Sequence, residues 1–327
     1  MTASARRMGR LTLGYVFALG ALAWIFHDLS WGELHPVLSR IAWPWVAAAV
    51  MADIASYACQ GTRWSLLLRP VGRISPLRAT EAIYAGLFVN ELLPMRLGEV
   101  LRAWLVSRRL GATPAAIIPA IAVERLFDSL WVAAAVAVAA AVVPLPGALL
   151  RVGDIFGILV GVALAAFLVL VLRAQGSPRA GAGRLRRFLA AQAGGIRAIG
   201  HSRYLLVAGV ISGGVLLLQG IAYWLVLRAC GIDLGVGPGF VAFLVVHLGT
   251  AIPNAPGNVG SYQLFAVLGL AIFGVAKAEA AAFSVAVFVL LTVPLWVLGW
   301  AALSHSGLSL RAARELLHRS PRAGGVS

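Results

Sequence analysis

Apolar residues in this chain occur in long unbroken runs rather than in the alternating pattern of a half-buried strand. Six of these runs approach or exceed the roughly 20 residues that a helix needs to cross the hydrocarbon core of a bilayer. Short segments rich in arginine, glycine and proline separate them. The pattern predicts an all-α polytopic membrane protein with six full spans: Leu11–Phe26, Ala42–Leu68, Ala115–Val143, Gly153–Leu172, Tyr204–Leu227 and Ala280–Leu303.

Two further apolar segments do not fit as simple spans. Arginines flank residues 79–94 on both sides, and a connection rich in arginine is expected to stay in the cytoplasm. We therefore predict a re-entrant hairpin over residues 79–111, entered from the cytoplasm and broken at Pro94–Gly98. A second hairpin, over residues 239–275, is expected to enter from outside and to break at Pro253–Gly260. Irregular backbone at this depth is tolerated only where protein or a water-filled cavity surrounds it.

The chain also matches itself at an offset of 159 residues. Residues 60–72 lie over residues 219–231 with 6 of 13 positions identical, and Pro94, Gly98 and Val100 lie over Pro253, Gly257 and Val259 without a gap. Each half then contains three spans and one hairpin. Because three crossings per half is an odd number, we expect an inverted repeat of residues 11–143 and 153–303, an arrangement typical of transporters.

Composition and charge agree with this class. The chain is 61% hydrophobic and 12% charged, with a mean hydropathy of +0.90, whereas soluble domains carry about 25% charged residues. The net charge of +15 comes from arginines in short connections, so we interpret it as a topology signal and expect no nucleic-acid partner. Both termini, including the basic tail 304–327, are expected in the cytoplasm of a bacterial inner membrane, with the first span uncleaved. Two isolated cysteines predict neither a metal site nor a cofactor.

The first hairpin carries the strongest candidate site. Proline and glycine keep its tip out of regular helix, and a helix that restarts after the tip would offer free N–H groups to an anion. Together with two arginines these groups predict a site for a phosphate, and Glu99 and Arg102 are spaced to pair on one helix face. The alternative is a structural kink whose arginines reach lipid headgroups. The candidate residues are Asn90, Pro94, Arg96, Gly98, Glu99 and Arg102.

The third span contains Glu124, Arg125 and Asp128. Ionised residues at membrane depth tend to face the interior of a helix bundle and to pair there. Glu124 and Asp128 share a helix face, one turn apart. We expect either a functional site or an ion pair that locks the third span to the first hairpin, and the two interpretations are compatible.

The second hairpin has no charged residue. Its candidate residues can offer only backbone and amide groups, so it is interpreted as a gate, as a site for headgroup hydroxyls, or as plain packing. They are Pro253, Pro256, Gly257, Asn258, Gly260 and Gln263. Two basic stretches outside the spans, Arg184–Ile199 and Leu308–Arg322, are typical of amphipathic helices on an anionic membrane surface.

The ordered trio of motifs, Leu92-Leu-Pro94-Met-Arg96-Leu-Gly98-Glu99, then Glu124-Arg125-Leu-Phe-Asp128, then Pro253-x-x-Pro256-Gly257-x-Val-Gly260, resembles the flippase-like membrane domain of lysylphosphatidylglycerol synthases. This resemblance implies movement of a lipid with a phosphate-bearing headgroup between leaflets. The full synthases carry an aminoacyl-transfer domain after the membrane part; 24 residues follow Leu303 here, so we expect no such activity from this chain. Asn258 and Gln263 stand where the family usually has glycine and an acid.

We therefore expect a lipid flippase or scramblase-like transporter that binds anionic membrane lipids and is not an enzyme. Glu99, Glu124 and Asp128 are the candidates for proton coupling. Two alternatives stay open. One is a non-transporting membrane partner of a lipid-modifying or glycosyl-transfer enzyme, and the other is an intramembrane enzyme that acts on a lipid headgroup.

Overall fold

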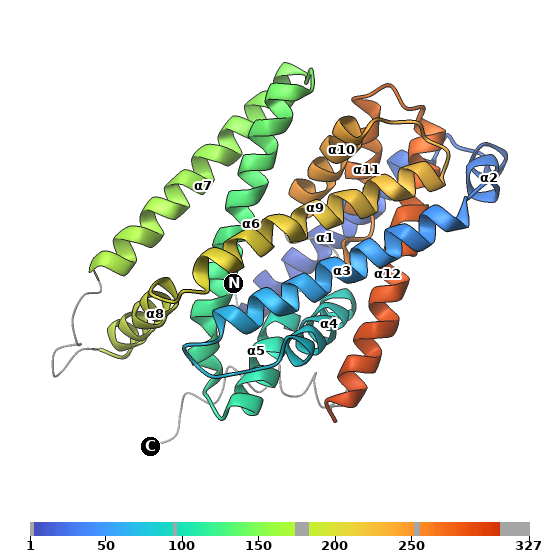
Figure 1. Cartoon of the computed structure of the whole chain (residues 1–327). Coiled ribbons are helices and arrows are strands. Elements are labelled where there is room, and N and C mark those ends of the chain that lie inside the picture. Colours follow the sequence, from blue (N-terminus) through green and yellow to red (C-terminus); the bar gives the residue numbers. More distant parts are fainter. Residues whose placement is uncertain (1–2, 94–96, 174–182, 252–255, 308–327) are drawn as a thin grey trace. The chain divides into compact units, whose positions relative to one another are not determined.

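The structure is a computed structural model that describes residues 3–93, 97–173, 183–251 and 256–307. Every regular element in these ranges is helical (Figure 1). The elements are α1 (Ala3–Phe26), α2 (Trp31–Ser39), α3 (Trp43–Leu67), α4 (Pro76–Leu92), α5 (Leu97–Leu110), α6 (Pro114–Val142), α7 (Gly147–Arg173), α8 (Arg184–Gly200), α9 (Leu205–Ala229), α10 (Val236–Gly249), the 3-10 helix η2 (Pro256–Asn258), α11 (Ser261–Ala271) and α12 (Lys277–His305).

Four of these helices are long and apolar enough to cross a membrane, within the residues that the structure describes. They are α6, α7, α9 and α12. α2 and α3 pass the same test only as a pair, and they meet at an angle of 80°, so a fifth span is obtained if the bent pair is one broken span. The apolar part of α1, Gly14–Phe26, is shorter than the 18 residues required of a candidate span. The all-helical membrane fold is thus confirmed, with four or five spans.

The segment 79–111 folds as two helices, α4 and α5, that face each other on either side of the expected break. At the tip, the Gly98 N–H donates to the Asn90 Oδ1 at 2.7 Å. Gly98 is required here, because a Cβ at this position would collide with the backbone carbonyl of Gly86 in α4. At the other end, Arg109 of α5 pairs with Glu81 of α4 at 3.2 Å.

The segment 239–275 has the same helix–break–helix form. α10 begins slightly earlier than expected, at Val236, and α11 follows the short helix η2. The two long arms lie side by side (Figure 1), with Gly269 of α11 against Ala242 of α10. Both breaks therefore fall where proline and glycine predicted them.

The chain forms two compact units. The first consists of residues 1–55, 84–101 and 218–327. In it, α11 packs against α1, α10 and α12, and α12 also packs against α2. The buried ring of Tyr223 lies 5.1 Å from the Phe283 ring and 6.0 Å from the Phe243 ring, between centroids.

The second unit consists of residues 56–83 and 102–217. α6 and α7 form an antiparallel pair in it (Figure 1), and α8 packs against both. α8 confirms the helix predicted over Arg184–Ile199, but its buried side chains (Ala193, Ile196 and Ile199) show that much of its apolar face contacts protein. The second predicted amphipathic helix, Leu308–Arg322, lies outside the described residues.

α2 is an element that the hydrophobic pattern did not predict, since its nine residues fall in the expected outer connection. Ser30 and Glu33 form a capping box at its start, where the Ser30 N–H donates to the Glu33 carboxylate at 2.7 Å. Such a box satisfies helix N–H groups that would otherwise lack a partner. The helix is therefore specified locally, by four residues, and not by an apolar run.

Candidate functional site

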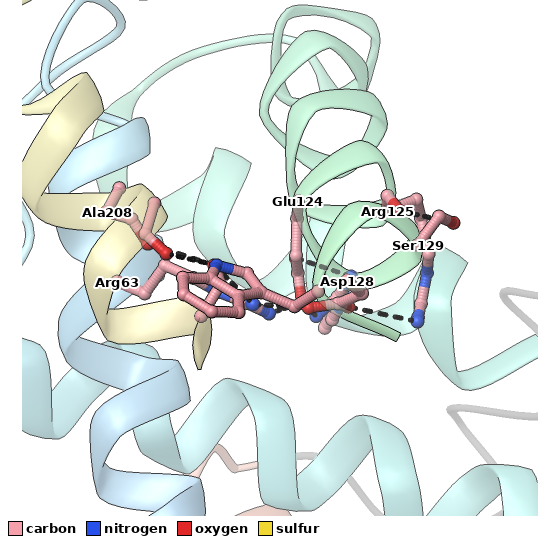
Figure 2. Close-up of polar contacts among 10 residues, drawn as sticks. Arg63, Glu124, Arg125, Asp128, Ser129 and Ala208 are labelled. Atoms are coloured by element: carbon pink, nitrogen blue, oxygen red, sulfur yellow. Dashed lines mark hydrogen bonds and ion pairs between the residues drawn. The ribbon is translucent and has the colours of Figure 1, made fainter. Parts of the chain in front are cut away.

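A cluster of charged side chains is buried in the second unit, where α3, α5, α6 and α9 each contribute a polar group. Glu124 and Asp128 come from α6 and, because they are four residues apart, project from the same helix face. Figure 2 shows both carboxylates directed toward Arg63 of α3, while Arg125 lies on the other side of α6. The predicted shared face of Glu124 and Asp128 is confirmed.

Glu124 lies between two guanidinium groups. Arg102 of α5 donates to it through a fork, with Nη1 3.2 Å from Oε1 and Nη2 3.0 Å from Oε2. Arg63 donates its Nη2 to the same Oε1 at 2.9 Å. A forked arrangement is the strongest form of this pairing, because both oxygens accept from one planar cation.

Arg63 also reaches beyond Glu124. Its Nη1 pairs with the Asp128 Oδ1 and donates to the Ser212 Oγ of α9 at 3.0 Å. Ser212 donates in turn to the Ala208 carbonyl at 2.9 Å, which fixes the hydroxyl. Arg125 is half exposed, and its Nη1 lies 3.7 Å from the Asp128 Oδ2. Arg63 is thus the centre of a network that ties α3 to α6 and α9.

The centre of the cluster is withdrawn from solvent. The side chains of Arg63, Glu124 and Arg102 are 1%, 2% and 6% exposed, respectively. Ionised groups that are buried to this extent persist only when they are paired with excellent geometry, because removing a charge from water is expensive. The Arg102 guanidinium also stacks over the Trp64 ring, 4.8 Å from its centroid. Such stacking compensates part of the lost hydration.

The ion pairs of the cluster join three guanidiniums (Arg63, Arg102 and Arg125) to two carboxylates (Glu124 and Asp128). The Nε atoms of Arg63 and Arg102 are both buried and have no hydrogen-bond partner among the described residues. A buried donor without a partner costs free energy, so these two N–H groups are available to an anion.

The structure corrects one expectation about these residues. Arg102 pairs with Glu124 across to α6 rather than with Glu99 on its own helix, because the acid at membrane depth needs a cation. Glu99 lies in the first turn of α5 and is partly exposed. The ion pair expected between the third span and the first hairpin is confirmed in this form.

Arg63 is the residue of this cluster that the sequence reasoning did not select. Its side chain is buried, and its two Nη atoms pair with Glu124 and Asp128. One signal was present. Arg63 lies inside the apolar run Ala42–Leu68, whereas Arg69, Arg73 and Arg78 all follow it.

The tips of the two hairpins meet within the first unit. Glu91, near the end of α4, lies against Gly257 of η2, since a Cβ on Gly257 would be 3.0 Å from the Glu91 Oε2. That oxygen is buried and has no hydrogen-bond partner among the described residues. Gly257 has a φ of +67°, a conformation that favours glycine. The two segments paired by the 159-residue offset are therefore neighbours, and Glu91 is a further polar group at their contact that the sequence reasoning did not select.

The local geometry of the second tip accommodates Asn258 and Gln263, the two residues that stand where the resembled family usually has glycine and an acid. Gln263 accepts from the Gly260 N–H through its Oε1 at 2.7 Å and so caps α11, as a carboxylate would. Asn258 adopts a φ of 54°, which asparagine tolerates better than most residues with a side chain.

Of the predicted site residues, Arg102, Glu124, Arg125 and Asp128 are brought together in one cluster. A second group comprises Asn90 and Gly98 in the first hairpin, and Pro256, Gly257, Asn258, Gly260 and Gln263 in the second. Pro94, Arg96 and Pro253 lie outside the described residues.

Comparison with known proteins identifies a curated relative and a family that match this chain. Glycosyltransferase AglD of Haloferax volcanii is 28% identical over 336 residues, which cover 87% of this chain and 53% of that protein. The chain thus spans about half the length of this curated relative. The family described as "Lysylphosphatidylglycerol synthase TM region" matches residues 11–299. That match confirms the resemblance drawn from the three ordered motifs. The chain belongs to the family of lysylphosphatidylglycerol synthase transmembrane regions.

Proposed function

We propose that this protein moves a lipid with an anionic, phosphate-bearing headgroup between the two leaflets of a bacterial inner membrane. The observation that carries the proposal is the buried cluster around Glu124, in which the Nε donors of Arg63 and Arg102 have no partner among the described residues. Ionised residues within membrane helices are rare, and they mark substrate or ion pathways in transporters. Family membership supports a role in lipid metabolism.

The forked pair between Arg102 and Glu124 suggests how a headgroup would bind. A tetrahedral phosphate can present two of its oxygens to a guanidinium fork, so it competes with Glu124 for Arg102. Glu124 would then keep its hydrogen bond from Arg63, 2.9 Å away, and would not be left as an unpaired charge. Glu124 and Asp128, with Glu99, are the groups proposed to take up protons if transport is coupled to them.

The topology proposed for this function has six spans and two re-entrant hairpins, with both termini in the cytoplasm. The order of the helices supports an inverted repeat. α3 and α9 both have 25 residues, and α6 and α12 both have 29. α3 and α6 precede and follow the first hairpin, as α9 and α12 precede and follow the second. Gly61 of α3 packs against Thr80 of α4, and its counterpart at the 159-residue offset, Gly220 of α9, packs against Phe240 of α10.

A second candidate function is a non-transporting partner of a membrane enzyme. The glycosyltransferase name of the relative favours it, since this chain spans about half of that protein. In such a role the buried cluster would serve stability alone. An intramembrane enzyme that acts on a lipid headgroup is a third candidate, and release of a headgroup product by the purified chain would identify it.

Leaflet transfer by the reconstituted chain separates these functions. Vesicles of phosphatidylcholine with a trace of fluorescent phosphatidylglycerol would be quenched from outside, so that only lipid reaching the outer leaflet is lost. Transport predicts faster loss with wild-type protein than with empty vesicles, and little transfer by Arg102→Gln. The matched control is Arg228→Gln, which breaks a more exposed ion pair with Asp233. Absence of transfer by wild type, or full transfer by Arg102→Gln, would overturn the proposal.

A further inference from the structure

Three arginines surround one tyrosine at the surface of the second unit, apart from the buried cluster. Arg69 follows the end of α3, and Arg203 and Tyr204 directly precede α9. The Arg69 guanidinium lies 5.3 Å from the centroid of the Tyr204 ring and that of Arg203 lies 4.9 Å from it. Arg203 also donates its Nη2 to the Tyr204 Oη at 2.8 Å. The hydrogen bond and charge of Arg203, with the charges of Arg69 and Arg73, hold the pKa of Tyr204 below its usual value.

These three cations lack a protein counter-charge among the described residues. The ion pairs of the second unit engage Arg63, Arg78, Arg102, Arg109 and Arg125 and none of the three. Gathering three like charges is unfavourable unless an anion compensates them. An aromatic ring offers each cation only a small attraction, so the tyrosine does not replace that anion.

One donor of the group is turned inward and unused. The Arg69 Nε is buried and has no hydrogen-bond partner among the described residues, whereas Arg73 and Arg203 are exposed. The buried Nε of Arg69 beside the exposed guanidiniums of Arg73 and Arg203 suits an anion with several oxygens. Each guanidinium can then donate to a different oxygen of that anion. A phosphate meets this requirement better than a single carboxylate.

The location indicates where such a phosphate comes from. α9 is long and apolar enough to cross the membrane and begins at Leu205, and α3 is the longer member of the bent pair that could also cross it. The group thus lies at the ends of two apolar helices, at the level where tyrosine and arginine meet lipid headgroups. We propose that Arg69, Arg73 and Arg203 form a binding site for a phosphate group, carried by an anionic lipid of the adjoining leaflet. This site does not depend on lipid transport.

Binding to the full chain in a neutral detergent tests the site. Phosphatidylglycerol and diacylglycerol, which have the same acyl chains but differ in phosphate, would each be titrated in mixed micelles. Wild type is expected to bind phosphatidylglycerol more tightly than diacylglycerol. Arg203→Gln, an exposed substitution, is expected to weaken phosphatidylglycerol binding about tenfold, and Arg69→Gln with Arg203→Gln to weaken it further. Diacylglycerol binding should not change.

Arg151→Gln is the matched control, because it removes an exposed arginine of α7 from the same unit. An equal loss in this variant, or no loss in Arg203→Gln, would overturn the site. Inorganic phosphate separates the two sources of the ligand. Competition at millimolar phosphate that Arg203→Gln abolishes would support the site with a free ion as its ligand, and lipid binding that phosphate does not displace would support the lipid. Leaflet transfer plays no part in these measurements, so loss of the transport proposal would leave them unaffected.

Discussion

The Arg102 guanidinium of α5 donates to both oxygens of the Glu124 carboxylate of α6, at 3.2 and 3.0 Å, and both side chains are buried. This pair joins the second helix of the first hairpin to a helix long enough to span the membrane. It also leaves Arg63 free to bridge Glu124 and Asp128. The stability of this part of the fold should therefore depend on one carboxylate.

Replacing that carboxylate should be strongly destabilising. Glu124→Gln leaves two buried guanidiniums without their shared counter-charge, and breaking a buried pair in this way costs about 3 to 5 kcal/mol. Unfolding in mixed micelles of increasing denaturing detergent measures the change. The control is Asp233→Asn, whose partner Arg228 lies at the surface, and an exposed pair contributes about 1 kcal/mol or less. Equal effects of the two substitutions would show that the buried network does not hold the helices together.

Arg102 should not be replaceable by lysine. An ammonium group cannot reproduce the fork to both Glu124 oxygens or the flat stacking on Trp64. A double-mutant cycle with Trp64→Leu and Arg102→Lys should give a coupling free energy of about 0.5 to 2 kcal/mol, because the stacking is desolvated. The same detergent titration provides the four free energies of unfolding. Strict additivity of the two substitutions would mean that the ring and the cation do not interact.

Much of this fold could be predicted from the sequence, for a physical reason. Apolar runs must be helical in lipid, since every backbone group has to be satisfied within the segment, and α6, α7, α9 and α12 follow the predicted runs closely. The break between α4 and α5 and the one at Gly257 were visible because proline and glycine mark both places in the sequence. α2 was missed, because a capping box specifies it and an apolar run does not.

The candidate site was predicted only in part. Glu124 and Asp128 share a face through helical spacing alone, so their neighbourhood followed from the sequence. Their partners did not, because Arg63 precedes Glu124 by 61 residues and periodicity carries no information about such contacts. Arg102 was expected to pair with Glu99 because the two are three residues apart on one helix. Such spacing identifies only local partners, whereas the buried acid Glu124 on another helix binds the guanidinium better.

Gly98 should be intolerant of any side chain. A Cβ at this position would overlap the carbonyl of Gly86, which is backbone and cannot rotate away. Gly98→Ala is therefore expected to separate α4 from α5 at the tip and to lower the unfolding free energy by about 2 kcal/mol or more. Gly161→Ala in α7 is the control, since a Cβ there meets nothing within 4 Å. In that helix alanine should be neutral or stabilising by up to about 1 kcal/mol. A neutral Gly98→Ala would contradict the close contact of the two helices.

The proposed topology places both ends of the first hairpin on the cytoplasmic side. In a chain with Cys59 and Cys230 replaced, Leu77→Cys and Ala112→Cys should react with a membrane-impermeant thiol reagent in inverted vesicles and be protected in intact cells. His35→Cys, in α2, should show the opposite behaviour. Reaction of Ala112→Cys from outside the intact cell would mean that residues 79–111 cross the membrane.

The ion pair between α12 and the loop after α1 predicts a dependence of stability on pH. The Lys277 ammonium donates to the Asp28 Oδ1 at 2.6 Å and to the Trp24 carbonyl at 3.1 Å. This hydrogen bond and charge hold the pKa of Asp28 below its ordinary value. Since the folded protein binds the proton less readily than the unfolded chain, the pair stabilises the fold above the unfolded pKa of about 4 and ceases to do so as the pH falls through the folded pKa.

Unfolding of wild type and Asp28→Asn should therefore differ at pH 6 and converge as the pH is lowered below about 4. Asp28 is exposed, so the difference at pH 6 should be small and should shrink in high salt. Lys277→Gln provides the matched test, because it removes the partner and should return the Asp28 titration to its ordinary range. A difference between wild type and Asp28→Asn that persists unchanged at pH 3 would mean that Asp28 acts through packing or hydrogen bonding and not through its charge.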